Sequence, residues 1–150
     1  MIIYEYFLVF LGAAIPWFEI ALVIPLGIVA GLSPFWVMVL AFVGNLSTVI
    51  PIVYAYDKVK QWLEKRRKKQ GKESSKRNER AKKIWNKYGL PGLALLGPIL
   101  IGIHIATFIG MSLGAQKNWV LVWMIASLAI WTLVFGFATI LGFDLFLQYQ

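Results

Sequence analysis

Four long apolar blocks are separated by a single charged stretch. Residues 34–56, 88–116 and 118–143 contain no charged side chain, and residues 2–32 contain only Glu5 and Glu19. A helix that crosses the hydrocarbon core of a membrane needs roughly 20 apolar residues. Blocks 34–56 and 118–143 therefore predict simple spanning helices, whereas 2–32 and 88–116 are longer than one span requires.

Proline and glycine interrupt the two longer blocks. Proline removes a helix hydrogen bond and clashes with the preceding turn, and backbone groups freed in lipid must be satisfied by protein or enclosed water. Paired broken segments favour re-entrant helices, which often form a binding site. A long, kinked helix is the alternative. The residues assigned to the breaks are Pro16, Pro25, Gly27, Pro98, Gly102 and Gly110.

A spaced motif occurs twice. Gly27-x3-Gly31-x4-Trp36-Val37 returns 83 residues later as Gly110-x3-Gly114-x4-Trp119-Val120. The sequence thus predicts an all-α integral membrane protein of two repeated halves, each a broken segment followed by a transmembrane helix. The halves are residues 1–56 and 88–150, joined by the basic loop 57–87. The Gly-x3-Gly pairs are also typical of helix-packing faces.

Composition and charge support a multi-pass protein of the cell membrane. Hydrophobic residues make up 59% of the chain and the mean hydropathy is +0.70, more than a soluble domain usually has. Fourteen of the fifteen Lys and Arg residues lie in 57–87, and Lys117 is the exception. Short basic loops stay in the cytoplasm, so we expect this loop to be cytoplasmic. The net charge of +8 then does not indicate nucleic-acid binding.

The basic loop has weak helical character, and its centre, residues 65–79, has almost no apolar residue, so we expect this centre to be mobile. Its basic side chains could bind anionic lipid headgroups. The simpler interpretation, which we favour, is that the charge only fixes topology. The side chains concerned are Arg66, Arg67, Lys68 and Lys69.

Glu19 is the main candidate for chemistry. A carboxylate this far into an apolar block should face a cavity or a partner, or be protonated, and intramembrane acids are generally functional. Glu19 could load and release a proton or bind a cationic substrate. Alternatively, it caps the start of a half-helix that follows Pro16.

His104 and Asn45 are weaker candidates. His104, the only histidine, lies two positions from the residue that aligns with Glu19, so the two could form a proton relay. It could instead bond a backbone carbonyl near Pro98. Asn45 and the nearby Ser47–Thr48 pair could line a path, although hydrogen bonding between helices is the more ordinary role.

The sequence motifs of common enzyme classes are missing. The chain has no cysteine and one histidine, which cannot form a usual zinc site. It also lacks a nucleophile elbow, a His-Glu-x-x-His motif and a Walker-type glycine loop. We therefore expect no enzyme activity, no metal and no cofactor. The expected partners are the lipid bilayer, a small-molecule or lipid substrate and a second copy of the chain in a homo-oligomer.

Several short motifs recur in a known pattern: Glu19 with Ile24-Pro25-Leu26-Gly27, then Gly44-Asn45, Pro51, and Lys87-Tyr88-Gly89 with Gly92-Leu93. In these motifs the chain resembles the small multidrug export protein family of prokaryotic membrane proteins. The resemblance implies re-entrant hairpins and a relation to DedA-type proteins that act on lipids. In place of the Arg that the family often has two residues after its Glu, this chain has Ala21, and residues 97–104 depart from the family's second-half loop.

Three functions remain open at this point. The leading hypothesis is a small membrane exporter, proton-coupled through Glu19, with an unknown substrate. The second is a DedA-like translocator of lipid or polyprenyl phosphate. The third is a membrane subunit with a structural or assembly role and no transport activity.

Overall fold

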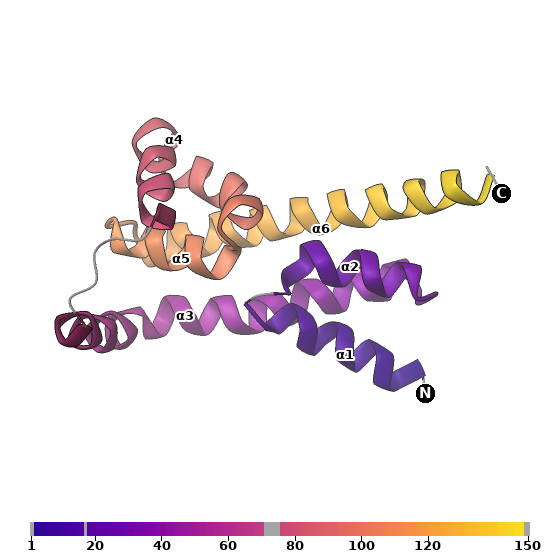
Figure 1. Cartoon of the computed structure of the whole chain (residues 1–150), viewed down its shortest axis with the longest axis horizontal. Helices are drawn as coiled ribbons and strands as arrows, with labels where there is room; N and C mark the ends of the chain where they lie inside the picture. Colours follow the sequence, from indigo (N-terminus) through magenta and orange to yellow (C-terminus); the bar gives the residue numbers. More distant parts are fainter. Residues whose placement is uncertain (1, 17, 71–75, 149–150) are drawn as a thin grey trace. The chain divides into compact units, whose positions relative to one another are not determined.

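All regular structure in the described part of the chain is helical. The computed structural model describes residues 2–16, 18–70 and 76–148. The predicted all-α, membrane-type fold is confirmed. The helices in this part of the chain are α1 (Ile2–Ala14), α2 (Glu19–Val29), α3 (Pro34–Gln70), α4 (Lys76–Leu100), α5 (Ile103–Ser112) and α6 (Lys117–Gln148), labelled in Figure 1.

Two helices among the described residues are long and apolar enough to cross a membrane. They are Pro34–Lys58 within α3 and Lys117–Leu145 within α6. The apolar helices Ile3–Ala14, Glu19–Val29, Tyr88–Leu100 and Ile103–Ser112 have only 10–17 residues. At 1.5 Å per residue, each is shorter than the ~30 Å hydrocarbon core. Each over-long block is therefore a pair of short helices.

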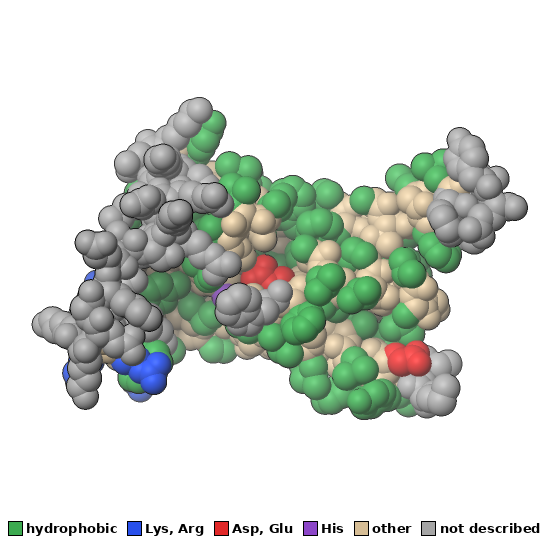
Figure 2. All heavy atoms as spheres, viewed as in Figure 1, with side chains coloured by type: hydrophobic (Ala, Val, Ile, Leu, Met, Phe, Trp, Pro, Cys, Tyr) green, Lys and Arg blue, Asp and Glu red, His purple; other side chains and the backbone are tan. Residues whose placement is uncertain are grey.

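Large apolar side chains cover much of the surface. They include Leu26 and Leu141, which are 58% and 61% exposed, and Figure 2 shows hydrophobic side chains across most of the described face. Apolar patches of this extent are rare on soluble monomers and indicate contact with lipid or partners. The exposed residues lie on the short helices as well as on α3 and α6.

The chain divides into two compact units. Unit one comprises Met1–Thr48 and Ile125–Gln150, and unit two comprises Val49–Met124. Each unit thus holds one pair of short helices together with parts of both long helices: α1 and α2 in unit one, α4 and α5 in unit two.

Glycines mark the helix crossings of unit one. A Cβ atom added to Gly27 of α2 would lie 2.9 Å from Val37 Cγ1 of α3. One added to Gly44 of α3 would overlap the carbonyl oxygen of Phe10 in α1. The missing side chains therefore let α3 approach both short helices closely, as small residues do in membrane helix packing.

In unit two, α4 packs on α5 at Gly97, where an added Cβ would lie 2.5 Å from Ala106 Cβ. Gly89 (φ 64°, ψ −155°) breaks the helical geometry within α4 and separates its charged first part from its apolar second part. A positive φ favours glycine, which has no Cβ to clash.

The repeated glycine motif forms the same helix end twice. Gly31 (φ 88°) follows α2 and Gly114 (φ 94°) follows α5. Both ends are Schellman motifs, in which an N–H group beyond the helix bonds back to a carbonyl of its last turn. The bonds are Leu32 N–H to the Gly27 carbonyl (3.1 Å) and Ala115 N–H to the Gly110 carbonyl (3.2 Å).

The packing-face interpretation does not hold for the second glycine of each pair. Among the described residues, and apart from each glycine's own chain neighbours, no atom lies within 4 Å of a Cβ added to Gly31 or Gly114. These glycines are needed for their backbone angle rather than for close packing. The Trp-Val pairs of the two motif copies have the same pattern of burial: Trp36 and Trp119 are exposed, whereas Val37 and Val120 are fully buried.

The basic segment is more helical than its composition predicts. α3 continues to Gln70 and α4 starts at Lys76. Residues 65–70 and 76–79 are therefore helical, whereas residues 71–75 lie outside the described residues. The expected mobility of 65–79 stays a prediction. The guanidinium carbon of Arg66 lies 4.3 Å from the ring centroid of Trp62. This contact stabilises the helical extension by a cation–π interaction. The side chains of Arg67, Lys68 and Lys69 lie outside the described part.

The crossing at Gly44 generates a stability prediction. Gly44→Ala should lower the free energy of unfolding by about 1–3 kcal/mol, because the new methyl group overlaps the Phe10 carbonyl. Gly142→Ala is the matched control, since α6 has open space there and alanine favours helix. Thermal unfolding in detergent measures both. Equal melting temperatures for the two variants would contradict the close crossing.

Candidate functional site

A tight turn in unit one separates α1 from α2. Ile15 and Pro16 follow α1, and the carbonyl oxygen of Ile15 accepts bonds from the N–H groups of Phe18 (3.1 Å) and Glu19 (3.4 Å). These bonds satisfy the Ile15 carbonyl and the N–H groups of Phe18 and Glu19, which have no water to bond in an apolar environment. Pro25, by contrast, lies inside α2 and does not interrupt it.

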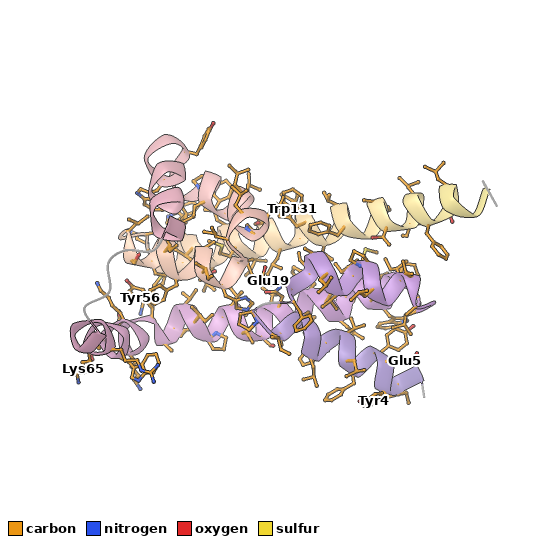
Figure 3. All side chains as sticks on the ribbon, viewed as in Figure 1. Tyr4, Glu5, Glu19, Tyr56, Lys65 and Trp131 are labelled. Atoms are coloured by element: carbon orange, nitrogen blue, oxygen red, sulfur yellow. The ribbon has the colours of Figure 1, made fainter. Side chains whose placement is uncertain are left out.

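Glu19 is the first residue of α2 and is held in an unusual backbone conformation. Its φ is 42°, and it is the one non-glycine residue with positive φ in the described part of the chain. This region costs an L-residue roughly 1–2 kcal/mol. The side chain is 93% buried, with 7% exposed, and Figure 3 labels it at the start of α2. Backbone strain at a buried acid is an observation from which function can be inferred.

The second half has a glycine at the matching position. Gly102, which lies 83 residues after Glu19, precedes α5 and has φ 90°. Glycine adopts this angle without a steric penalty. Unit one therefore keeps a carboxylate where the backbone favours glycine. The two halves thus share a positive φ at this position but differ in the side chain that it carries.

The position of Glu19 is also compatible with the capping alternative. An acid in the first turn of a helix interacts favourably with the helix dipole, and Glu19 lies in the first turn of α2. The residue before it, Phe18, is the N-cap and makes no side-chain cap hydrogen bond. The position of Glu19 is thus compatible both with helix capping and with a functional carboxylate, and its strained φ is an additional observation in favour of the second.

Asn45 is the second polar group in unit one. It is fully buried on α3, and neither atom of its carboxamide has a hydrogen-bond partner among the described residues. The expected bond between helices is therefore not seen there. Buried amides are nearly always paired because an unpaired one is costly. The free carboxamide makes Asn45 a candidate contact for a bound molecule.

The neighbouring hydroxyl groups are already engaged. Ser47 Oγ donates to the Gly44 carbonyl (2.6 Å), and Thr48 Oγ1 donates to the Asn45 carbonyl (2.9 Å). Both bonds lie within α3 and do not reach another helix. Of the polar cluster predicted in this block, Asn45 alone keeps a wholly unpaired, fully buried side chain.

His104 lies in unit two, on α5, and is 5% exposed. Glu19 and Asn45 both belong to unit one. A relay between Glu19 and His104 thus stays a prediction. Of the residues assigned to the breaks, Pro16 and Gly102 lie in the turns, whereas Pro98 and Gly110 lie inside α4 and α5.

Two buried hydroxyl groups were not anticipated from the sequence. Thr132 Oγ1 in unit one and Tyr56 Oη in unit two have no hydrogen-bond partner among the described residues. Thr132 lies near the middle of an uncharged block, where any polar side chain is a possible signal. Tyr56 lies at the end of a block and resembles an ordinary interfacial tyrosine, although its ring packs on Phe108 with centroids 5.3 Å apart.

The described residues contain no group of three or more His, Cys, Asp or Glu side chains that could hold a metal ion. The buried polar side chains described in unit one are those of Glu19, Asn45, Ser127 and Thr132. These groups can bind a proton, a cation or a polar part of a small molecule. They do not form a catalytic triad or a metal centre.

These features define an all-α, membrane-type protein with a buried acid at a helix break. Residues 19–134 match the model of the family described as "Putative small multi-drug export protein", and the chain belongs to this family. The resemblance seen in the short motifs is thereby confirmed. The family is named for export and not for an enzymatic reaction. No curated protein and no solved structure matches the chain.

The strain at Glu19 can be measured directly. Glu19→Gly should be more stable than Glu19→Ala by about 1 kcal/mol or more, because both variants lack the carboxylate but only glycine adopts φ 42° freely. At Leu22, inside α2, the same pair of substitutions should give the opposite order, since alanine favours helix. Chemical denaturation in detergent measures the four variants. Greater stability of Glu19→Ala would show that Glu19 is not strained.

Proposed function

We propose that this protein is a small membrane exporter that uses Glu19 to couple proton entry to the outward movement of its substrate. The observation that carries the proposal is the buried, strained carboxylate in the break between α1 and α2. Membership of an export family supports the transport class. An acid kept inside an apolar segment at a conformational cost is typical of proton and ion pathways.

In the proposed mechanism, Glu19 alternates between a neutral and an ionised form. Ionised Glu19 attracts a cationic or polar substrate, and protonation removes that attraction and releases the substrate. Asn45 holds the substrate through its unpaired carboxamide, which can both donate and accept hydrogen bonds. We also propose His104, on α5 of unit two, as a further proton acceptor.

We also propose that the two broken segments are structural repeats. Three matches at the same 83-residue offset support this view: the Schellman ends of α2 and α5, the positive φ of Glu19 and Gly102, and the buried Val37 and Val120. Paired broken helices in two halves are the usual plan of a carrier's binding region.

The arrangement of charges at the start of α6 supports re-entrant segments. Lys117 Nζ lies 3.2 Å from Asp57 Oδ2, and both residues belong to unit two. Asp57 opens the basic loop, which we assign to the cytoplasm from its charge. Lys117 is then cytoplasmic as well, so residues 88–116 enter and leave the membrane on one side.

The same reasoning places the termini. If α3 and α6 each cross once, Pro34 and Leu145 lie outside, opposite the basic loop. A re-entrant first segment then puts the N-terminus outside as well. We further propose that the protein acts as a homo-oligomer in the cell membrane, because a chain with two spanning helices has little protein with which to enclose a path.

Transport tests the role of Glu19. Glu19→Gln should abolish the pH-dependent part of substrate efflux from proteoliposomes, because glutamine keeps the shape of the side chain but cannot titrate. Glu5→Gln is the matched control, since Glu5 lies in the first turn of α1 and is not part of the site. Flux of a cationic fluorescent compound is followed with and without a proton gradient.

The outcome separates the two roles of the acid. Normal pH dependence in Glu19→Gln would make Glu19 a structural cap and would overturn proton coupling. Gel filtration shows whether the variant is folded. Labelled-lipid movement, measured in the same vesicles without a gradient, distinguishes an exporter from a lipid translocator.

Cysteine labelling tests the topology. The chain has no native cysteine, so single cysteines give no background. Tyr4→Cys and Leu145→Cys should react with an impermeant thiol reagent in intact cells, whereas Lys65→Cys should react only after permeabilisation. All three native side chains are exposed. Labelling of Lys65→Cys in intact cells, or protection of Tyr4→Cys, would contradict the re-entrant arrangement.

A further inference from the structure

Aromatic and basic side chains alternate at every fourth position where the apolar span of α3 ends. Residues four apart on a helix lie on the same face. The two aromatic members, Tyr54 and Trp62, are 66% and 54% exposed. The two basic members are exposed as well, and the row contains no acid. The aromatic–basic row consists of Tyr54, Lys58, Trp62 and Arg66.

The row faces away from the side of α3 that packs within unit two. Val49, Val53 and Tyr56 are buried, and at 3.6 residues per turn they lie opposite the centre of the row. The ring of Tyr56 contacts Phe108 of α5 there. Lys60 continues this opposite face, and its Nζ lies 5.9 Å from the centroid of the Tyr56 ring. Basic side chains thus occur on two faces of α3, and the row is the face with exposed aromatic rings.

The row crosses the boundary between the hydrocarbon core and the lipid headgroups. The apolar span ends at Lys58, and Trp62 lies four residues further along the same helix. Four residues correspond to about 6 Å of helix, and each headgroup layer is roughly 5–8 Å thick. Trp62 therefore lies within the headgroup layer. Tryptophan is enriched at this depth, because its ring is apolar and its N–H group is polar.

Arg66 is directed back toward this layer. Side chains of an α-helix lean toward its N-terminus, and the part of α3 before Arg66 is the apolar span. The guanidinium carbon of Arg66 accordingly lies 4.3 Å from the centroid of the Trp62 ring, one turn earlier. A guanidinium can contact an aromatic ring through its face and a phosphate through its N–H edge at the same time.

We propose that the aromatic–basic row is a binding site for anionic phospholipids. Lys58 and Arg66 hold the headgroup phosphate, and the two aromatic rings contact the glycerol backbone and the first part of the acyl chains. The acid next to Lys58 does not compete with the phosphate, because Asp57 Oδ2 accepts a hydrogen bond from Lys117 Nζ at 3.2 Å.

The occupant is a lipid because the row begins inside the apolar span and continues without interruption into the charged extension of α3. A soluble anion could use the basic side chains but would leave the aromatic rings exposed. The proposed topology places the row at the cytoplasmic leaflet, whose anionic lipids attract basic segments beside a span. Lipid binding at the row does not depend on proton coupling through Glu19.

Native mass spectrometry of the purified protein measures the binding. The protein in detergent is mixed with phosphatidylglycerol or phosphatidylcholine of the same acyl chains, and the lipids bound to the intact protein are counted. Both lipids have a phosphate, but the choline group cancels the charge of the second. The unchanged protein should bind phosphatidylglycerol about fivefold more tightly or better.

Arg66→Gln should weaken phosphatidylglycerol binding about fivefold, the effect of one basic residue at a membrane surface. Lys60→Gln is the matched control, because it removes the same charge, also near an aromatic ring, from the opposite face of the helix. It should change the affinity by less than about twofold. Trp62→Leu keeps every charge and should weaken binding roughly twofold, since Arg66 loses the ring that it contacts.

Equal losses in Arg66→Gln and Lys60→Gln would overturn the proposal, because a charge that only fixes topology acts without regard to the helix face. Equal affinity of the unchanged protein for the two lipids would also overturn it. A disulfide between two copies of Tyr54→Cys, oxidised in lipid nanodiscs, would show that a second chain covers the row instead. The variants change exposed side chains, and binding is measured without a proton gradient, so its failure would leave the coupling role of Glu19 standing.

Discussion

The structure depends on one constraint: a polypeptide in an apolar environment must satisfy its own backbone hydrogen bonds. Helices meet this requirement along their length, so every break needs a local solution. The turn after α1 folds back onto the Ile15 carbonyl, and the ends of α2 and α5 close through Schellman motifs. The positions of proline and glycine follow from these solutions. The broken segments exist because their ends can be closed without water.

Close helix crossings supply the second element of the architecture. Two apolar helices in lipid gain little from hydrophobic burial, so they associate through tight packing. Gly27 and Gly44 permit such packing in unit one, and Gly97 does so in unit two. Polar groups are few in this setting, which makes those without partners conspicuous. The side chains of Asn45 and Thr132 are of this kind among the described residues.

Much of the fold could be predicted because charge and hydrophobicity are sorted so clearly along the chain. The spans in α3 and α6, the breaks near Pro16 and Gly102, and the family all followed from pattern and motif. The helical extension of α3 to Gln70 did not follow from the sequence pattern. Lys and Arg favour helix individually, but the high density of like charge in this segment suggested disorder. The role of Gly31 in the turn after α2 could not be predicted either, because a Gly-x3-Gly motif is equally typical of a helix-packing face.

The site was less accessible to sequence reasoning. Glu19 stood out as an acid in an apolar block, but its backbone angle could not be inferred from neighbours that are ordinary helix formers. For Asn45 the sequence predicts a hydrogen bond between helices, because a sequence does not show whether a side-chain amide has a hydrogen-bond partner. Thr132 could not be singled out from the sequence, because the hydroxyl of a threonine in a membrane helix normally donates a hydrogen bond to a backbone carbonyl of the same helix. The strained backbone angle of Glu19 also stores conformational free energy. A rearrangement that returned this residue to ordinary helical angles would recover roughly 1–2 kcal/mol. That free energy is enough to shift the ratio of two conformations about five- to thirtyfold. Under the proposed coupling, relief of this strain would add to the free energy that protonation of Glu19 supplies.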